Sequence, residues 1–401
     1  MKFTYKHTLL SCYGCFIIQS IVNNLSPLLF VTYSKEFNVS LDQITLLISY
    51  NFIVQMLVDM IGVRYAYRIG YRRGMMIAHS ASFLGLTGLA VFTSIMPPFV
   101  GLLLATTLCA LGSGFIEVLA SPIVEALPFG EKSAAMSLLH SFYCWGHIAI
   151  VILSTLFFAL VGVESWRILT ILWALIPAVN GVLFLFVPLA ELQGDIEKQG
   201  SFFALFKLKG FPIFLILMVC TGAMEQGLAQ WSSLFAETGL GVSKTLGDLL
   251  GPCMFGLMMA ISRTFYGIRG AKLDLTKFMS ICAIGVLIGY VLCVFSPHPI
   301  ISLIGCGLAG LFVGIFWPGS LSVASRHIPM GGTTMFAMLA FAGDIGCALG
   351  PGLIGFVSER VNSNLGLKAG ILSAVIFSAS AFIVLRIIRI RDKAENRSSR
   401  M

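Results

Sequence analysis

Long apolar runs are the feature that most constrains the fold of this chain. Charged residues cluster between runs of about 20 apolar residues, which is roughly the length of helix that crosses a bilayer. The runs are continuous and do not alternate, so they predict helices and not the strands of a barrel. Only 11% of the residues are charged and the mean hydropathy is +0.93, whereas about a quarter of the residues are charged in a soluble protein. The sequence therefore predicts an all-α, multi-pass membrane protein.

The runs predict twelve membrane spans, and the longest polar interruption, Glu191 to Gly210, divides them into two sets of six. We therefore expect an N-terminal six-helix bundle at 1–190, a linker at 191–210, a C-terminal six-helix bundle at 211–388 and a polar tail at 389–401. The spans are expected at 8–30, 42–63, 74–95, 99–125, 133–160, 167–188, 211–235, 247–268, 278–296, 299–322, 333–356 and 368–388.

The basic residues orient these spans. Of the 26 Lys and Arg residues, 20 lie on the side of the two termini, and Arg263 alone lies away from the end of a span. The positive-inside rule then places both termini in the cytoplasm. The net charge of +8 follows from this asymmetry, so it predicts no nucleic-acid partner. The short loops favour a bacterial inner membrane, with the lipid bilayer as the surrounding partner and a monomer as the expected state.

Several spans carry polar residues on one helical face. Such residues are candidates for function because hydrocarbon excludes them unless a cavity or a partner accepts them. Glu117 is the strongest case, because it stands alone in an apolar run and an unpaired buried charge costs several kcal/mol. The faces have i, i+4, i+7 or i, i+4, i+8 spacing and comprise Gln19, Asn23 and Ser26 in span one, Asn51, Gln55 and Asp59 in span two, and Ser113, Glu117 and Ser121 in span four.

A twelve-span chain with a polar central loop resembles the major facilitator superfamily, in which two pseudo-symmetric six-helix bundles enclose a midplane substrate site. The loop "DMIGVRYAYRIGYRRG" also resembles that superfamily's signature between spans two and three. Arg68, Arg72 and Arg73 fit its basic positions, although Tyr67 stands where an acid is expected and Asp59 lies further upstream. The resemblance implies that Asp59 and these three arginines form a conformational latch.

A second resemblance is more specific. "GSGFIEVLASPIVEAL", "LLHSFYCWG" and "VNNL" look like spans four, five and one of the fucose permease branch, whose members are sugar–proton symporters. Glu117 takes the place of the family's cavity glutamate, His140 that of a glutamine and Tyr143 that of an asparagine. One position differs, because Ser26-Pro27 replaces an Asn-Asp pair whose aspartate is thought to bind sugar or proton. Either Glu117 couples alone, or Glu225 or Asp344 takes the second role, or the protein is a uniporter.

This resemblance implies a secondary active transporter that imports a monosaccharide or similar solute together with protons by alternating access. A sugar site combines polar side chains, which bond hydroxyls, with aromatic surfaces, which contact the ring faces. Proton coupling needs an acid that takes up a proton on one side and releases it on the other. Candidate coupling residues are Glu117, Glu225 and Asp344. Candidate substrate-binding residues are Asn23, Asn24, Glu117, His140, Tyr143, Gln226, Gln230, Trp231 and Trp317.

Other interpretations remain open. Methionines and phenylalanines, 17 and 32 in number, would also suit an efflux antiporter for amphipathic compounds. A non-transporting nutrient sensor would keep the cavity and signal through a partner. Glu117 would have a purely structural role if it paired with a buried base such as Arg263. The sequence contains no HExxH motif, P-loop or serine elbow, so no enzyme activity, cofactor or metal is expected.

Overall fold

The computed structural model describes residues 3–128, 132–190, 210–269, 274–328, 332–361 and 365–398, with the side chains of 62–68, 132–137, 267–269, 332–334 and 393–398 excepted. Within these ranges the chain is helical and has no strand. Twelve helical segments there are long and apolar enough to cross a membrane, which confirms the number of spans that the sequence predicts.

The N-terminal half contains the first six spans. The first span changes from an α-helix to a 3-10 turn where Pro27 follows α1, because proline lacks the N–H that would continue the α-helical hydrogen bonding. The elements are α1 (Tyr5–Asn24), a 3-10 turn (Ser26–Leu29), α2 (Phe30–Phe37), α3 (Leu41–Ile69), α4 (Tyr71–Ile95), α5 (Pro98–Ala126), α6 (Lys132–Val161), a second 3-10 turn (Val163–Ser165) and α7 (Trp166–Phe186).

The C-terminal half contains the other six spans, several of which are broken. Spans seven and eight each include a π-type turn, and spans ten and twelve are each built from two helices. The elements are α9 (Phe211–Leu234), a π-turn (Phe235–Gly239), α10 (Lys244–Asp248), a π-turn (Leu249–Cys253), α11 (Met254–Arg269), α12 (Leu275–Phe295), α13 (Pro299–Val313), α14 (Phe316–His327), α15 (Gly332–Arg360), α16 (Gly366–Ser373) and α17 (Val375–Ser398).

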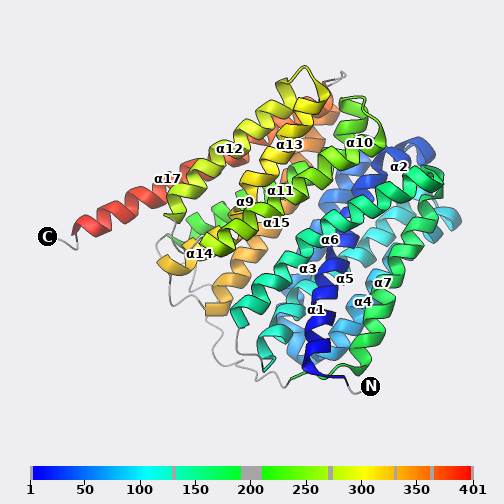
Figure 1. Cartoon of the computed structure of the whole chain (residues 1–401), viewed down its shortest axis with the longest axis horizontal. Helices are drawn as coiled ribbons and strands as arrows, with labels where there is room; N and C mark the ends of the chain where they lie inside the picture. The colour runs from blue at the N-terminus through cyan, green and yellow to red at the C-terminus, as the bar shows by residue number, and fades with distance from the viewer. Residues whose placement is uncertain are drawn as a thin grey trace.

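Figure 1 shows the two halves as separate bundles, with α1 to α7 in one and α9 to α17 in the other. The fold is thus the predicted pair of six-helix bundles. Short connections make neighbouring spans antiparallel, so α1, α4, α6, α9, α12 and α15 start on the side of the chain termini. The proposed linker, 191–210, falls almost entirely outside the described residues.

Within each bundle, small residues bring helix backbones close together. The contact between α9 and α15 depends on Gly346, since a Cβ atom there would lie 2.0 Å from the carbonyl oxygen of Val219. Gly112 of α5 approaches α4 in the same way, with 2.8 Å between its Cβ position and the carbonyl oxygen of Ala78. Close backbone packing replaces the hydrophobic effect as the force that holds helices together in lipid.

Replacing Gly346 tests this packing. We expect Gly346→Ala to lower the free energy of unfolding by about 1–3 kcal/mol, because the methyl group overlaps backbone that cannot move aside. Gly227→Ala, in the same interface, is the matched control, since its nearest contacts would be side-chain atoms, the closest being the Tyr290 hydroxyl oxygen at 3.2 Å. Thermal unfolding of the purified variants measures the difference. Equal melting temperatures for the two variants would contradict the packing argument.

The two halves meet mainly through α3 with α15 and through α6 with α11. On the side opposite the termini, Gly355 of α15 lies against Thr45 of α3, and the Ser49 hydroxyl donates to the carbonyl oxygen of Ala348 at 3.3 Å. These contacts hold the halves together on that side.

Candidate functional site

A cavity of about 480 Å³ lies between the two halves. Its volume falls within the range of about 300–1,000 Å³ that small-molecule sites occupy. Leu321 and Ser322 of α14 and Tyr266 of α11 line it near the helix ends on the side of the termini. Eight spans contribute to the wall, which comprises Phe16, Gln19, Asn23, Phe52, Gln55, Glu117, His140, Ser141, Tyr143, Glu225, Gln226, Arg263, Tyr266, Trp317, Pro318, Leu321, Ser322, Asp344 and Cys347.

Glu117 faces this cavity from α5 and is held by two amides. The Nε2 atoms of Gln19 and Gln55 both donate to its Oε2 atom, each at 2.8 Å. Gln19 comes from α1 and Gln55 from α3, so three helices of the N-terminal half fix the position of one carboxylate. Charge-assisted hydrogen bonds of this kind are among the strongest in proteins. Arg263, the base considered as a structural partner of this acid, pairs with Glu225 and not with Glu117.

The amides belong to a longer polar network. Gln55 Oε1 accepts from the Ser113 hydroxyl at 2.7 Å and from Asn23 Nδ2 at 3.4 Å. Asn23 Oδ1 in turn accepts from Asn51 Nδ2 at 3.3 Å. The polar faces of spans one, two and four therefore point at one another and connect Glu117 with the side of the site that lies opposite the termini.

Two further acids stand beside Glu117. Carboxylate oxygens of Asp59, Glu117 and Asp344 all lie within 4.8 Å of one another. Asp59 can sit against α5 because residue 114 is glycine, whose Cβ position lies 2.9 Å from Asp59 Oδ1. Asp344 comes from α15, so this cluster joins the two halves.

The remaining charges of the cavity form an ion pair within the C-terminal half. Arg263 Nη2 donates to both carboxylate oxygens of Glu225, each at 2.9 Å. Their side chains are 18% and 7% exposed. Arg263 also contacts Cys144 Sγ of α6, at 3.3 Å, and so reaches the other half. Glu225 neutralises this arginine, which leaves the cluster of Asp59, Glu117 and Asp344 without a lysine or arginine partner of its own among the wall residues.

Removing one member of the ion pair should destabilise the fold. We expect Glu225→Gln to lower the free energy of unfolding by about 3–5 kcal/mol, because it leaves the Arg263 charge buried without compensation. Thermal unfolding of the purified protein measures the loss. The double variant Glu225→Gln/Arg263→Gln should recover part of it, since no charge is then left unpaired. If Glu225→Gln alone is as stable as the wild type, the ion pair does not contribute to the free energy of unfolding.

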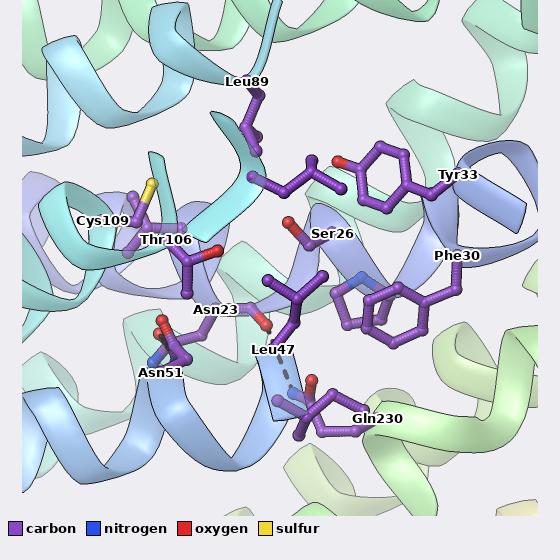
Figure 2. Close-up of a pocket in the computed structure, with 14 residues that line it drawn as sticks. Asn23, Ser26, Phe30, Tyr33, Leu47, Asn51, Leu89, Thr106, Cys109 and Gln230 are labelled. Carbon is purple, nitrogen blue, oxygen red and sulfur yellow. Dashed lines mark hydrogen bonds between the residues drawn. The ribbon is translucent and has the colours of Figure 1, made fainter. Parts of the chain in front are cut away.

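On the side opposite the termini the site is closed. Figure 2 shows a second, much smaller pocket there, where Asn23, Ser26, Tyr33, Asn51 and Gln230 converge from the first span, α3 and α9. Gln230 Nε2 donates to the backbone carbonyl oxygen of Asn23 at 3.2 Å, which ties α9 to α1 across the two halves (Figure 2). Asn23 lines both pockets, so it forms the boundary between the cavity and the closed side.

Lys244 adds a second tie on the closed side. Its Nζ atom donates to the carbonyl oxygen of Leu28 in the N-terminal half at 2.6 Å. The same atom lies 3.0 Å from Asp248 Oδ2 and 3.2 Å from Glu237 Oε1 in its own half. Asp248 is fully buried and also accepts from the Thr155 hydroxyl of α6 at 3.3 Å.

Most candidate site residues converge on the cavity, and three do not. Asn24 is turned into the protein, where its Nδ2 atom donates to the carbonyl oxygen of Ser20 at 2.9 Å. Trp231 is fully buried and donates to the carbonyl oxygen of Pro351 at 3.0 Å. Gln230 lines the small pocket. Those in the cavity wall are Asn23, Glu117, His140, Tyr143, Glu225, Gln226, Trp317 and Asp344.

The residues of the suggested latch are dispersed. Arg72 donates to carbonyl oxygens at the end of α7, with 2.8 Å to Leu185 and 2.8 Å to Val187, so its hydrogen bonds stay within its own half. Asp59 belongs to the acid cluster. Arg73 is exposed, and the side chain of Arg68 lies outside the described residues. The ties between halves at Lys244 and Gln230 lie instead on the opposite side.

Several polar residues of the site were not among the candidates, and the most informative are Gln19, Gln55 and Arg263 in its role as the partner of Glu225. The i, i+4 spacing of the polar faces already contained Gln19 and Gln55. Arg263 carried a signal too, as the one basic residue away from the ends of the predicted spans. Its choice of Glu225 over Glu117 depends on tertiary packing.

Comparison with known proteins defines the class. The family model described as Major Facilitator Superfamily matches residues 11–268. The chain belongs to the major facilitator superfamily. It is a membrane transporter and not an enzyme. A comparison with curated protein sequences found no match.

Solved structures share the fold at low sequence identity. A D-xylose-proton symporter is 12% identical, with a TM-score of 0.81 over 96% of this chain and 97% of the other. The Escherichia coli fucose:proton symporter FucP, in a structure of a single-residue variant, is 16% identical, with a TM-score of 0.65 over 95% and 98%. The nucleoside transporter NupG, also in a structure of a single-residue mutant, is 17% identical, with a TM-score of 0.73 over 96% and 98%.

Proposed function

We propose that this transporter imports a small polar solute, a monosaccharide or related polyol, together with protons by alternating access. The observation that carries the proposal is the position of Glu117, an acid that two amides hold at the wall of a central cavity between the two halves. Similarity of fold to a D-xylose-proton symporter and to a fucose:proton symporter supports the same class of solute and ion.

The cavity wall has the two kinds of surface that a sugar needs. Asn23, Gln226, His140 and Tyr143 offer hydrogen-bond donors and acceptors for hydroxyl groups. Trp317 and Phe16 offer flat apolar surfaces for the ring faces. The wall residues come from both halves, so a bound solute would contact both and would sense their movement.

Glu117 would couple this movement to protons. Both amides donate to its Oε2 atom, which leaves Oε1 to carry a proton when the acid is neutral. Asn23 lies two hydrogen bonds from Glu117 through Gln55, and it also accepts from Gln230 of the other half. When the closed side opens, the hydrogen bond from Gln230 to Asn23 is broken. Asn23 is hydrogen-bonded to Gln55, and Gln55 to Glu117, so movement of Asn23 alters the hydrogen bonding of the acid.

The distribution of basic residues supports an orientation with both termini in the cytoplasm. In that orientation the cavity extends toward the cytoplasm, and Lys244 and Gln230 close the periplasmic side. The arrangement would then be the inward-facing one, from which a solute and a proton leave for the cytoplasm.

Transport into proteoliposomes tests the proposal. Purified protein reconstituted in vesicles with an alkaline interior should accumulate labelled monosaccharide above its external concentration, and a protonophore should abolish the accumulation. Labelled fucose, xylose, galactose and glucose form the first panel. If none of them accumulates under the gradient, the proposed coupling is wrong.

Efflux of amphipathic cations is the second candidate. It is favoured by the acids of the cavity, which outnumber Arg263, and by the aromatic side chains of Phe16, Phe52, Tyr266 and Trp317 in the same wall. Thermal-shift measurements separate the two functions, because a ligand that binds only the folded state raises the melting temperature. Stabilisation by sugars favours import, and stabilisation by lipophilic cations favours efflux.

A further inference from the structure

The cluster of Asp59, Glu117 and Asp344 has a geometry that proton binding alone does not require. Its carboxylate oxygens come from α3, α5 and α15 and all lie within 4.8 Å of one another. Three carboxylates at this separation repel one another strongly unless protons or a cation neutralise them. The basic group of the cavity wall, Arg263, is already bonded to both oxygens of Glu225.

A neutral side chain beside the cluster offers a fourth oxygen. Gln19 is only 5% exposed, and its Nε2 atom donates to Glu117 Oε2 at 2.8 Å, which places the amide directly against the cluster. Its Oε1 atom is buried without a hydrogen-bond partner among the described residues, and so is Asp59 Oδ1. Buried polar atoms normally have a partner, so two orphaned acceptors at one place indicate that a hydrogen-bond donor or a cation is missing there.

The set of ligand atoms indicates which kind of group this is. Carboxylate and amide oxygens are hard ligands, which bind hard cations in preference to zinc or copper. Three oxygens within 4.8 Å of one another can surround an ion with bonds of about 2.4 Å, as in a calcium site. Sodium is similar in size to calcium.

We propose that Asp59, Glu117 and Asp344, with the Gln19 carbonyl oxygen, bind one hard cation of the size of sodium or calcium between the two halves. Asp59 and Glu117 belong to the N-terminal half and Asp344 to the C-terminal half, so the cation stabilises the present arrangement of the bundles. When α15 moves away from α3, the site loses Asp344 and the cation is released. Protons compete with the cation for the same oxygens. The other charged or titratable groups in the wall of the same cavity are His140, Tyr143, Glu225, Arg263, Tyr266 and Cys347.

The inference rests on the proposed function only in that the site faces the transport cavity. Its test is an equilibrium measurement on detergent-purified, chelator-treated protein, without solute or gradient. NaCl and CaCl2 are titrated in separate arms while the melting temperature is followed, with choline chloride at matched ionic strength as the reference. Saturable stabilisation by sodium or by calcium, absent with choline, is expected.

Variants connect the stabilisation with the site. Asp344→Asn should weaken the apparent cation affinity by at least about tenfold, since even loss of a group behind a ligand costs that much. Asp59→Asn and Gln19→Leu provide independent variants if Asp344→Asn does not fold. Glu164→Gln, an acid outside the cavity, is the matched control and should keep the wild-type affinity.

The outcomes are distinct from those of the transport test. No cation-specific stabilisation at any concentration, or stabilisation that persists unchanged in Asp344→Asn and Asp59→Asn, overturns the site and leaves the transport proposal intact. Stabilisation that the variants abolish supports the site, even if a pH gradient drives no sugar uptake. In that case the ion that drives transport is the cation.

Discussion

Glu117→Gln is expected to abolish accumulation of solute against its gradient and to preserve exchange. Glutamine keeps the size of the side chain and an oxygen that accepts from Gln19 and Gln55, so the amide network and the cavity shape should survive. It cannot take up or release a proton, so the solute no longer moves together with one. Counterflow of labelled against unlabelled solute in proteoliposomes should stay within about threefold of the wild-type rate, because exchange needs no net proton movement.

The control for this variant is Asp274→Asn, an exposed acid at the start of α12 outside the cavity. It should accumulate solute as the wild type does. Undiminished accumulation in Glu117→Gln would remove Glu117 from the coupling mechanism. Loss of both accumulation and counterflow would make it a binding residue and not a coupling residue.

Lys244→Met is expected to open the closed side of the transporter. Methionine removes the hydrogen bond to Leu28 across the halves and leaves the buried Asp248 without its ion pair. An uncompensated buried charge costs about 3–5 kcal/mol, and a shift of about 3 kcal/mol changes an equilibrium by about 100-fold. The population should therefore move toward the arrangement in which the side opposite the termini is accessible.

Cysteine labelling measures this shift without an engineered reporter. Cys109 lines the small pocket on the closed side and is only 4% exposed. We expect a maleimide to label Cys109 at least about tenfold faster in Lys244→Met than in the wild type, with each modified peptide read by mass spectrometry. Cys293, fully buried between α12 and α13, should stay unlabelled and so report an intact fold.

Lys35→Met, an exposed lysine on the same side, is the matched control and should label like the wild type. Equal labelling of Cys109 in Lys244→Met and Lys35→Met would show that Lys244 does not hold the two halves together.

The sequence predicted the class and the number of spans because both depend on local properties. Continuous apolar runs predict that the segments are helical and cross the bilayer, and the position of the polar linker divides the chain into two halves. The polar faces of spans one, two and four were also predictable, since i, i+4 spacing places Asn51, Gln55 and Asp59 on one side of a helix. These polar side chains converge near Glu117 because, within the membrane, they need either a water-filled cavity or polar side chains of other spans as partners.

Contacts between distant helices could not be predicted in this way. Nothing local distinguishes Trp231, which is buried against Pro351, from Trp317, which lines the cavity. The same holds for Arg263, whose partner is Glu225 and not Glu117. Asp344 and Asp59 are 285 positions apart in the chain, and only the packing of α15 on α3 brings them together.

Proton movement during solute entry tests the central claim most directly. Unlabelled solute is added to de-energised, lightly buffered proteoliposomes while the external pH is recorded. If Glu117 carries a proton with each solute, the medium becomes alkaline on addition of the solute, and the change disappears with a protonophore and in Glu117→Gln. Entry of labelled solute at the wild-type rate with no change of external pH would contradict proton coupling at this site.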